Sequence, residues 1–116
     1  MKYKLHLLVI VGVWLSISLT MNCYADANTR IGMANSLTAK WKAEGFPVVF
    51  KAIGKDNRIL RITQNNITQE PLLTEGQLFN LLGIYLESGV QEKLKRIGFI
   101  RGEVIDGRHR KYPFEL

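Results

Sequence analysis

The start of the chain constrains the fold most, because it has the features of a segment that is removed before the rest folds. Two lysines precede an apolar run over residues 7–19, and Ala25 and Ala27 stand at positions −3 and −1 of a cut after Ala27. A positive start, a short apolar run and small residues before the cut are typical of a secretory signal. We therefore expect a signal peptide over 1–27 and a single small domain over 28–116.

Two alternatives to cleavage follow from the same segment. One is an uncleaved membrane anchor, although the run is shorter than the roughly 20 apolar residues that span a bilayer. The other is lipid attachment at Cys23, with Asn22 standing where a lipoprotein signal needs a small residue. A cut after Ala27 removes the chain's single cysteine, so we expect no disulfide partner in the periplasmic or secreted form.

Length and composition exclude several classes of protein. Residues 28–116 are too few for a multidomain enzyme, a two-lobed binding protein or a (β/α)₈ barrel. An apolar content of 47% and a charged content of 22% are those of a globular chain rather than a disordered one. The formal net charge of +6 favours contact with anionic lipid, lipopolysaccharide or nucleic acid, and it is equally typical of a soluble surface.

The first half of the domain reads as a helix followed by a β-hairpin. Apolar residues line one face of a helix over 29–44, with Asn28 or Thr29 as its cap; they are Ile31, Ala34, Leu37 and Trp41. Gly45 and Phe46 form what we call a glycine stop, in which the glycine ends the helix and the next side chain folds back onto its last turn. Strands over 48–53 and 58–64 flank turn residues 54–57, and alternation puts Leu60 and Ile62 on the buried face.

The second half repeats this order after a polar connection over 65–72. Thr74 and Gln77 form a capping box, Ser88-Gly89 kinks the helix that follows, and Gly98 ends it. Strands over 99–105 and 108–116 then flank Asp106-Gly107, a strong hairpin signal, and Pro113 confines the last strand to an edge.

The two halves resemble each other at an offset of 53 residues. Lys40, Lys42, Gly45, Phe46 and Gly54 match Lys93, Lys95, Gly98, Phe99 and Gly107. Duplication and convergence of two helix–hairpin units both explain the match. Either way we predict an α+β fold of order αββαββ, with one mainly antiparallel sheet of three or four strands and its helices packed on one face.

This order of elements, with its glycine-punctuated strands, resembles the BON domain of exported bacterial proteins. That likeness implies contact with the envelope or with phospholipid. The helix, Gly-Phe, strand, Asp-Gly and aromatic strand over 94–116 are also similar to small uncharacterised exported bacterial proteins. This second likeness implies no activity, and neither carries site residues over to this chain.

The helix after Thr74 is apolar on nearly all sides. A helix without a polar face lies at the centre of a core or packs against a partner. We therefore take Phe79, Leu82 and Leu86 as a candidate partner-binding face.

The C-terminal hairpin concentrates charge and carries a second set of candidate residues for binding: Arg101, Arg108, His109, Arg110 and Lys111. Alternation predicts Arg108 and Arg110 on one face, His109 and Lys111 on the other, with Glu103 within reach of His109 across the hairpin. Such a cluster would bind anionic groups, protect an edge strand from aggregation, or serve as the acid–base site of a small secreted nuclease.

The sequence shows no metal-ligand cluster, phosphate loop, dinucleotide fingerprint or nucleophile elbow, so we expect no metal, no cofactor and no enzymatic activity. We predict an exported bacterial binding module that contacts an envelope component or a partner protein, with the apolar helix and the last edge strand as its surfaces. The alternative function is binding of anionic lipid headgroups or nucleic acid through the basic hairpin; a secreted nuclease is the third.

Overall fold

A computed structural model describes residues 26–116, and the expected signal segment lies outside them except for its last two residues. The elements follow in the order α2 (Ala27–Ala43), β1 (Val49–Ile53), the 3₁₀ turn η1 (Lys55–Asn57), β2 (Ile59–Gln64), α3 (Glu75–Tyr85), α4 (Ser88–Arg96), β3 (Arg101–Asp106) and β4 (Lys111–Glu115). The predicted α+β fold is confirmed, and the second helix is two helices.

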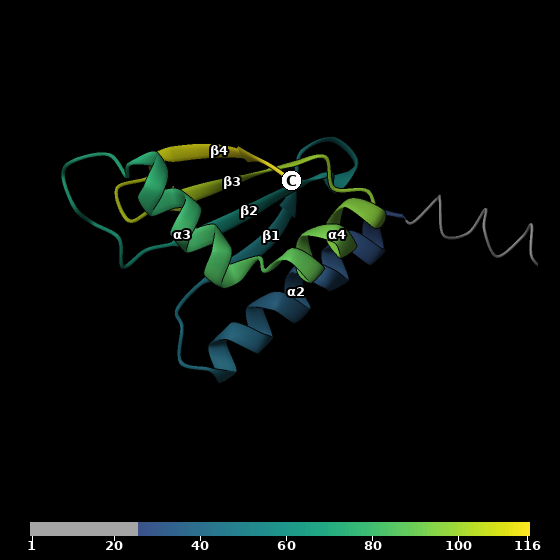
Figure 1. Ribbon diagram of the computed structural model, residues 1–116. Coiled ribbons are helices and arrows are strands. Elements are labelled where there is room, and N and C mark those ends of the chain that lie inside the picture. Colours follow the sequence, from purple (N-terminus) through teal and green to yellow (C-terminus); the bar gives the residue numbers. More distant parts are fainter. Residues whose placement is uncertain (1–25) are drawn as a thin grey trace, which may run out of the picture.

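The four strands form one mixed sheet in the order β1-β2-β3-β4 (Figure 1). The two hairpins, β1·β2 and β3·β4, are antiparallel, and β2 pairs with β3 in parallel through the connection that contains α3 and α4. The three helices of the described chain, α2, α3 and α4, lie on one side of the sheet (Figure 1). The opposite face of the sheet is bare of described elements.

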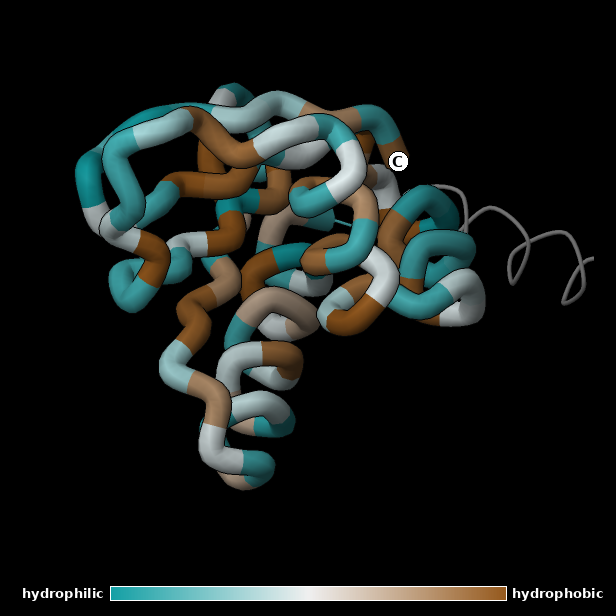
Figure 2. The backbone as a smooth tube through the Cα atoms, turned by 60° about the vertical axis from the view of Figure 1, so that its left-hand side comes forward, coloured by the Kyte–Doolittle hydropathy of each residue, from teal (hydrophilic) through white to brown (hydrophobic). Residues whose placement is uncertain are grey.

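Alternation along the strands divides buried from exposed side chains. Fully or nearly buried residues stand side by side in the register on the helix side, as in the row Phe50, Ile62, Val104 and Tyr112. The predicted burial of Leu60 and Ile62 is confirmed. Figure 2 shows hydrophobic strand segments gathered inside, with hydrophilic loops at the periphery.

Both glycines end their helices where the sequence predicted. Gly45 and Gly98 have φ values of 87° and 106°, which favour glycine because it lacks a Cβ. Phe46 and Phe99 return to the preceding helix through N–H bonds to Trp41 O (2.9 Å) and Leu94 O (3.1 Å). The similarity between the halves therefore extends to the geometry of two helix ends.

The N-terminus of α2 differs from the prediction. Asp26, rather than Asn28 or Thr29, is the cap, and its carboxylate accepts the Thr29 N–H at 3.0 Å. This hydrogen bond holds the pKa of Asp26 below its usual value. A chain cut after Ala27 would lose this cap, whereas a cut after Ala25 would keep it.

The buried face of α2 also differs from the prediction at its first turn. Ile31 is exposed, and Arg30, at 2% exposure, takes the interior position. Its guanidinium donates to Asp56 O, Asn57 O and Ile97 O. Arg30 thus joins the start of α2 to η1 and to the end of α4.

The two outer edges of the sheet are blocked by different means. On β1, the Phe50 N–H donates to the Thr38 hydroxyl at 2.8 Å, so α2 covers part of that edge. On β4, the Asp106 N–H donates to Arg110 O, and alternation from that pair turns the backbone of Lys111, Pro113 and Glu115 outward. Pro113 has no N–H, so a strand added here would lack a hydrogen bond at its centre.

Candidate functional site

The charged residues of the C-terminal hairpin converge on Asp106, which is fully buried at the end of β3. Its carboxylate accepts the Arg108 and Arg110 backbone N–H groups, the Arg110 Nε–H at 2.7 Å and the Tyr112 hydroxyl at 2.9 Å. Burial alone raises the pKa of Asp106, but these hydrogen bonds outweigh it and lower the pKa to about 2. Asp106 is therefore an ionised structural centre rather than a proton donor near neutral pH.

The two hairpin arginines hold the 65–72 connection. Arg108 Nε donates to Thr68 O at 2.7 Å, and the Arg110 guanidinium donates to Gln69 O and Glu70 O. The Gly107 N–H donates to Ile67 O at 2.7 Å, and a Cβ on Gly107 would meet Asn65 O at 2.3 Å. The predicted anion-binding arginines thus contact carbonyls of their own chain.

The hairpin turn is longer than predicted. The expected two-residue Asp-Gly turn is absent, because residues 107–110 form the loop between β3 and β4, with a left-handed His109 (φ 62°) near its end. The register sets Glu103 opposite Pro113, while His109 lies exposed in the loop. The predicted approach of Glu103 to His109 is therefore wrong.

Arg101 and Lys111 lie on the bare face of the sheet. Both side chains are exposed, and Lys111 Nζ is 3.4 Å from Glu103 Oε2. From the sequence we group them with Arg108 and Arg110, but the loop separates the two pairs. Arg101 and Lys111 lie on the bare face, whereas Arg108 and Arg110 hold the 65–72 connection.

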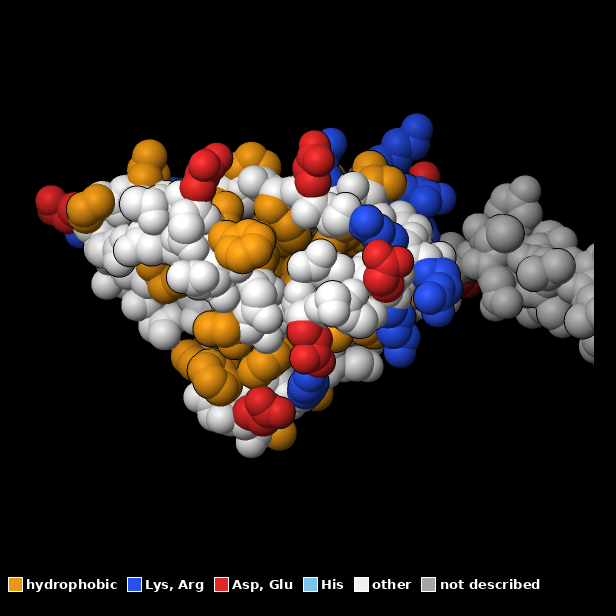
Figure 3. Space-filling view, viewed as in Figure 1, with side chains coloured by type: hydrophobic (Ala, Val, Ile, Leu, Met, Phe, Trp, Pro, Cys, Tyr) orange, Lys and Arg blue, Asp and Glu red, His pale blue; other side chains and the backbone are white. Residues whose placement is uncertain are grey.

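The predicted partner face lies over two adjoining shallow depressions between α3, α4 and the end of β4, which we call the helix groove. Its lining residues are Glu75, Gly76, Leu78, Phe79, Asn80, Leu82, Gly83, Leu86, Glu87, Ser88, Gln91, Phe114 and Glu115. The larger depression encloses about 580 Å³. Figure 3 shows hydrophobic side chains gathered in this hollow, with acidic side chains around it.

The three predicted residues of this face have different environments. Phe79 is 77% exposed, Leu82 is half-buried, and Leu86, at 1% exposure, belongs to the core. Phe79 is therefore accessible to a partner and Leu86 is not, while the binding role of this face stays a prediction. Leu86 is the C-cap of α3, and its side chain belongs to the hydrophobic core.

The strand side of the groove comes from residues that the sequence did not mark as a site. Phe114 lies beside α3 because Gly102, its partner on β3, leaves room for the ring: a Cβ on Gly102 would be 2.1 Å from Phe114 Cζ. The sequence signal that could have indicated this packing was a glycine opposite an aromatic residue in the predicted hairpin. Glu115 then adds its carboxylate to the rim.

No protein-family model, curated protein or solved structure matches the chain, so both resemblances remain predictions. Within residues 26–116, no group of histidine, cysteine or carboxylate side chains could hold a metal ion. In the same part of the chain, no helix has the length and apolar character needed to cross a bilayer.

Proposed function

We propose that the protein is an exported, non-enzymatic binding module whose helix groove holds an apolar segment of a partner protein. The observation that carries the proposal is Phe79, a 77% exposed phenylalanine beside an apolar depression. Exposed aromatic side chains next to pockets are typical anchors of protein interfaces. Leu82 and Phe114 continue the apolar surface from helix to strand.

Charge around the groove specifies the partner's chemistry. Glu75, Glu87 and Glu115 are exposed in its lining, which contains no lysine or arginine among the described residues. The whole chain carries 16 lysines and arginines against 10 acidic residues, so an acidic rim stands out from the rest of the surface. The complementary segment has one or two large apolar anchors flanked by lysine or arginine.

The other two functions draw less support from the geometry. Arg108 and Arg110 are engaged with the 65–72 connection, so anion binding through the hairpin would compete with the contacts that hold that loop. A nuclease at the hairpin would have to work without the expected Glu103–His109 pair. A partner strand added along β4 would lack one backbone hydrogen bond at Pro113, which has no N–H.

Binding of designed peptides tests the proposal. The probes are fluorescent peptides with a central leucine–phenylalanine pair flanked by two lysines, or by two glutamates, on each side. We expect the lysine-flanked peptide to bind more tightly. Phe79→Ser should weaken this binding at least about tenfold, equivalent to about 1.4 kcal/mol. Fluorescence anisotropy measures both affinities.

Leu72→Ser provides the matched control, because Leu72 is similarly exposed but lies on the connection outside the groove. It should leave the affinity unchanged. Equal losses in the two variants, or a preference for the glutamate-flanked peptide, would show that the groove is not the binding site.

A further inference from the structure

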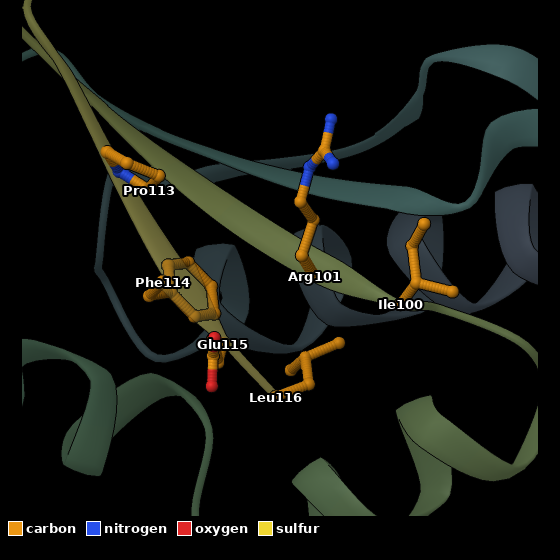
Figure 4. Close-up of a pocket in the computed structure, with 6 residues that line it drawn as sticks. All are labelled: Ile100, Arg101, Pro113, Phe114, Glu115 and Leu116. Carbon is orange, nitrogen blue, oxygen red and sulfur yellow. The ribbon is translucent and has the colours of Figure 1, made fainter.

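The bare face of the sheet carries a second depression, which we call the sheet-face site. It encloses about 550 Å³ and is lined by Ile53, Ile59, Arg61, Arg101, Gly102, Glu103, Lys111 and Pro113. Residues from all four strands contribute, so the sheet itself fixes their positions. Figure 4, a close-up of a neighbouring pocket at the ends of β3 and β4, labels two of these residues, Arg101 on β3 and Pro113 on β4.

A buried carboxylate organises the cations of this site. Glu103 is 6% exposed, and its two oxygens lie 3.4 Å from Arg61 Nη2 and 3.4 Å from Lys111 Nζ. Both distances exceed the 2.7–2.9 Å or so of a tight charge-assisted bond. Glu103 Oε2 and Arg61 Nε are buried without a hydrogen-bond partner. Glu103 therefore holds Arg61 and Lys111 beside the same depression, which Arg101 also lines.

The charges and the apolar lining together indicate a ligand class. Arg61, Arg101 and Lys111 outnumber Glu103, which leaves two positive charges for an incoming group. A phosphate monoester carries nearly two negative charges near neutral pH and offers several acceptor oxygens to guanidinium groups. Ile53 and Ile59 lie in the same depression and would cover an aliphatic tail.

The aromatic residues argue against a nucleic acid as the ligand. The strand aromatics Phe50, Tyr112 and Phe114 all face the helices. Single-stranded nucleic acids bind open sheets by stacking bases on exposed aromatic rings beside basic residues. The sheet face offers aliphatic side chains in their place.

We propose that the sheet-face site binds the head group of an alkyl phosphate, with phosphate among Arg61, Arg101 and Lys111 and the aliphatic chain over Ile53 and Ile59. This inference is independent of the helix groove, since the two sites lie on opposite faces of the sheet.

Calorimetric titration of the purified protein with decyl phosphate, below its micelle concentration, tests the inference. Decyl phosphate should bind at least about tenfold more tightly than inorganic phosphate, because burial of methylene groups adds to the charge term. Binding should weaken with salt. Replacing Arg101 and Lys111 together by alanine should reduce the affinity at least tenfold, and thermal unfolding of the variant checks that loss of the Lys111–Glu103 ion pair leaves the domain folded.

The matched control replaces Lys93 and Lys95, two exposed cations on α4 and outside the depression, and should change the affinity less than threefold. An equal loss in both double variants would overturn the inference in favour of general charge attraction. Inorganic phosphate binding as tightly as decyl phosphate would also overturn it. Binding to phosphatidylglycerol vesicles without binding to the monomeric amphiphile would assign the face to a membrane surface instead.

Discussion

Asp106→Asn is expected to lower the free energy of unfolding by about 3 kcal/mol, among the largest effects of any single substitution in this domain. The substitution keeps the side-chain volume but removes the charge that faces Arg110 Nε at 2.7 Å. It also sets an amide N–H₂ against the donors of Arg110 and Tyr112. Chemical denaturation of both proteins measures the difference.

The same change should loosen the 65–73 segment. Asp106 positions Arg110, which donates to Gln69 O and Glu70 O, and Tyr112, whose hydroxyl accepts the Leu73 N–H. Amide hydrogen exchange across this segment should therefore accelerate in the variant more than exchange in β1 and β2. A uniform loss of exchange protection across the domain would indicate general destabilisation and would contradict a specific role of Asp106 in holding the 65–73 segment.

The pH dependence of stability follows from the pKa of Asp106. Its folded-state pKa of about 2 lies below the ordinary value of 3.8, so protons bind the unfolded chain more readily. The stabilisation is complete above about pH 4 and disappears as the pH falls toward 2. Asp106→Asn should therefore lose less stability than the wild type over that interval.

Glu70→Gln is the matched control for this substitution. It also converts a carboxylate into an amide beside a hairpin arginine, since Glu70 Oε1 lies 3.7 Å from Arg108 Nη2. Glu70 is highly exposed, and exposed ion pairs contribute at most about 1 kcal/mol. A cost at position 106 no larger than the cost at position 70 would contradict the central role of Asp106.

Arg30→Met should cost about 3 kcal/mol by a different mechanism. The apolar side chain fills most of the space but leaves Asp56 O, Asn57 O and Ile97 O without the guanidinium that they accept from. Arg30→Lys should recover part of the loss, because one ammonium cannot reproduce the fork of donors. Thermal or denaturant unfolding measures both variants.

Arg58→Met serves as the control for position 30. Arg58 is exposed and donates through Nη1 to Gly98 O, next to the carbonyl that Arg30 contacts. We expect this loss to stay below about 1 kcal/mol. Similar costs at positions 30 and 58 would mean that burial of Arg30 adds no special stability.

The sequence predicts the fold well where local chemistry decides it. The glycine stops, the capping box at Thr74 and the alternation around Leu60 depend on neighbours a few residues away, and the structure confirms each. Burial of Arg30 in place of Ile31 depends on carbonyls 26 to 67 residues distant. Hydrophobic periodicity favours an isoleucine over an arginine as the buried residue of a helix face, and it contains no information about distant carbonyl acceptors.

The candidate sites show the same division. Alternation predicted which face each residue of the last strand would take, but the arginines lie in a loop that Asp106 reorganises, where alternation no longer applies. The apolar helix indicated Phe79, which the structure places at the surface and whose role in binding stays a prediction. Its partners on β4 became visible only through the register that sets Phe114 across from Gly102.

Photocrosslinking within the producing cells tests the central claim, that the helix groove holds an apolar and basic partner segment. A benzophenone amino acid replaces Phe79 in one protein and Leu72, the exposed control outside the groove, in another. We predict crosslinks from position 79 alone, to a segment in which a large apolar residue has lysine or arginine within about three positions. Equal crosslinking from position 72, or capture of an acidic segment at position 79, would contradict the claim.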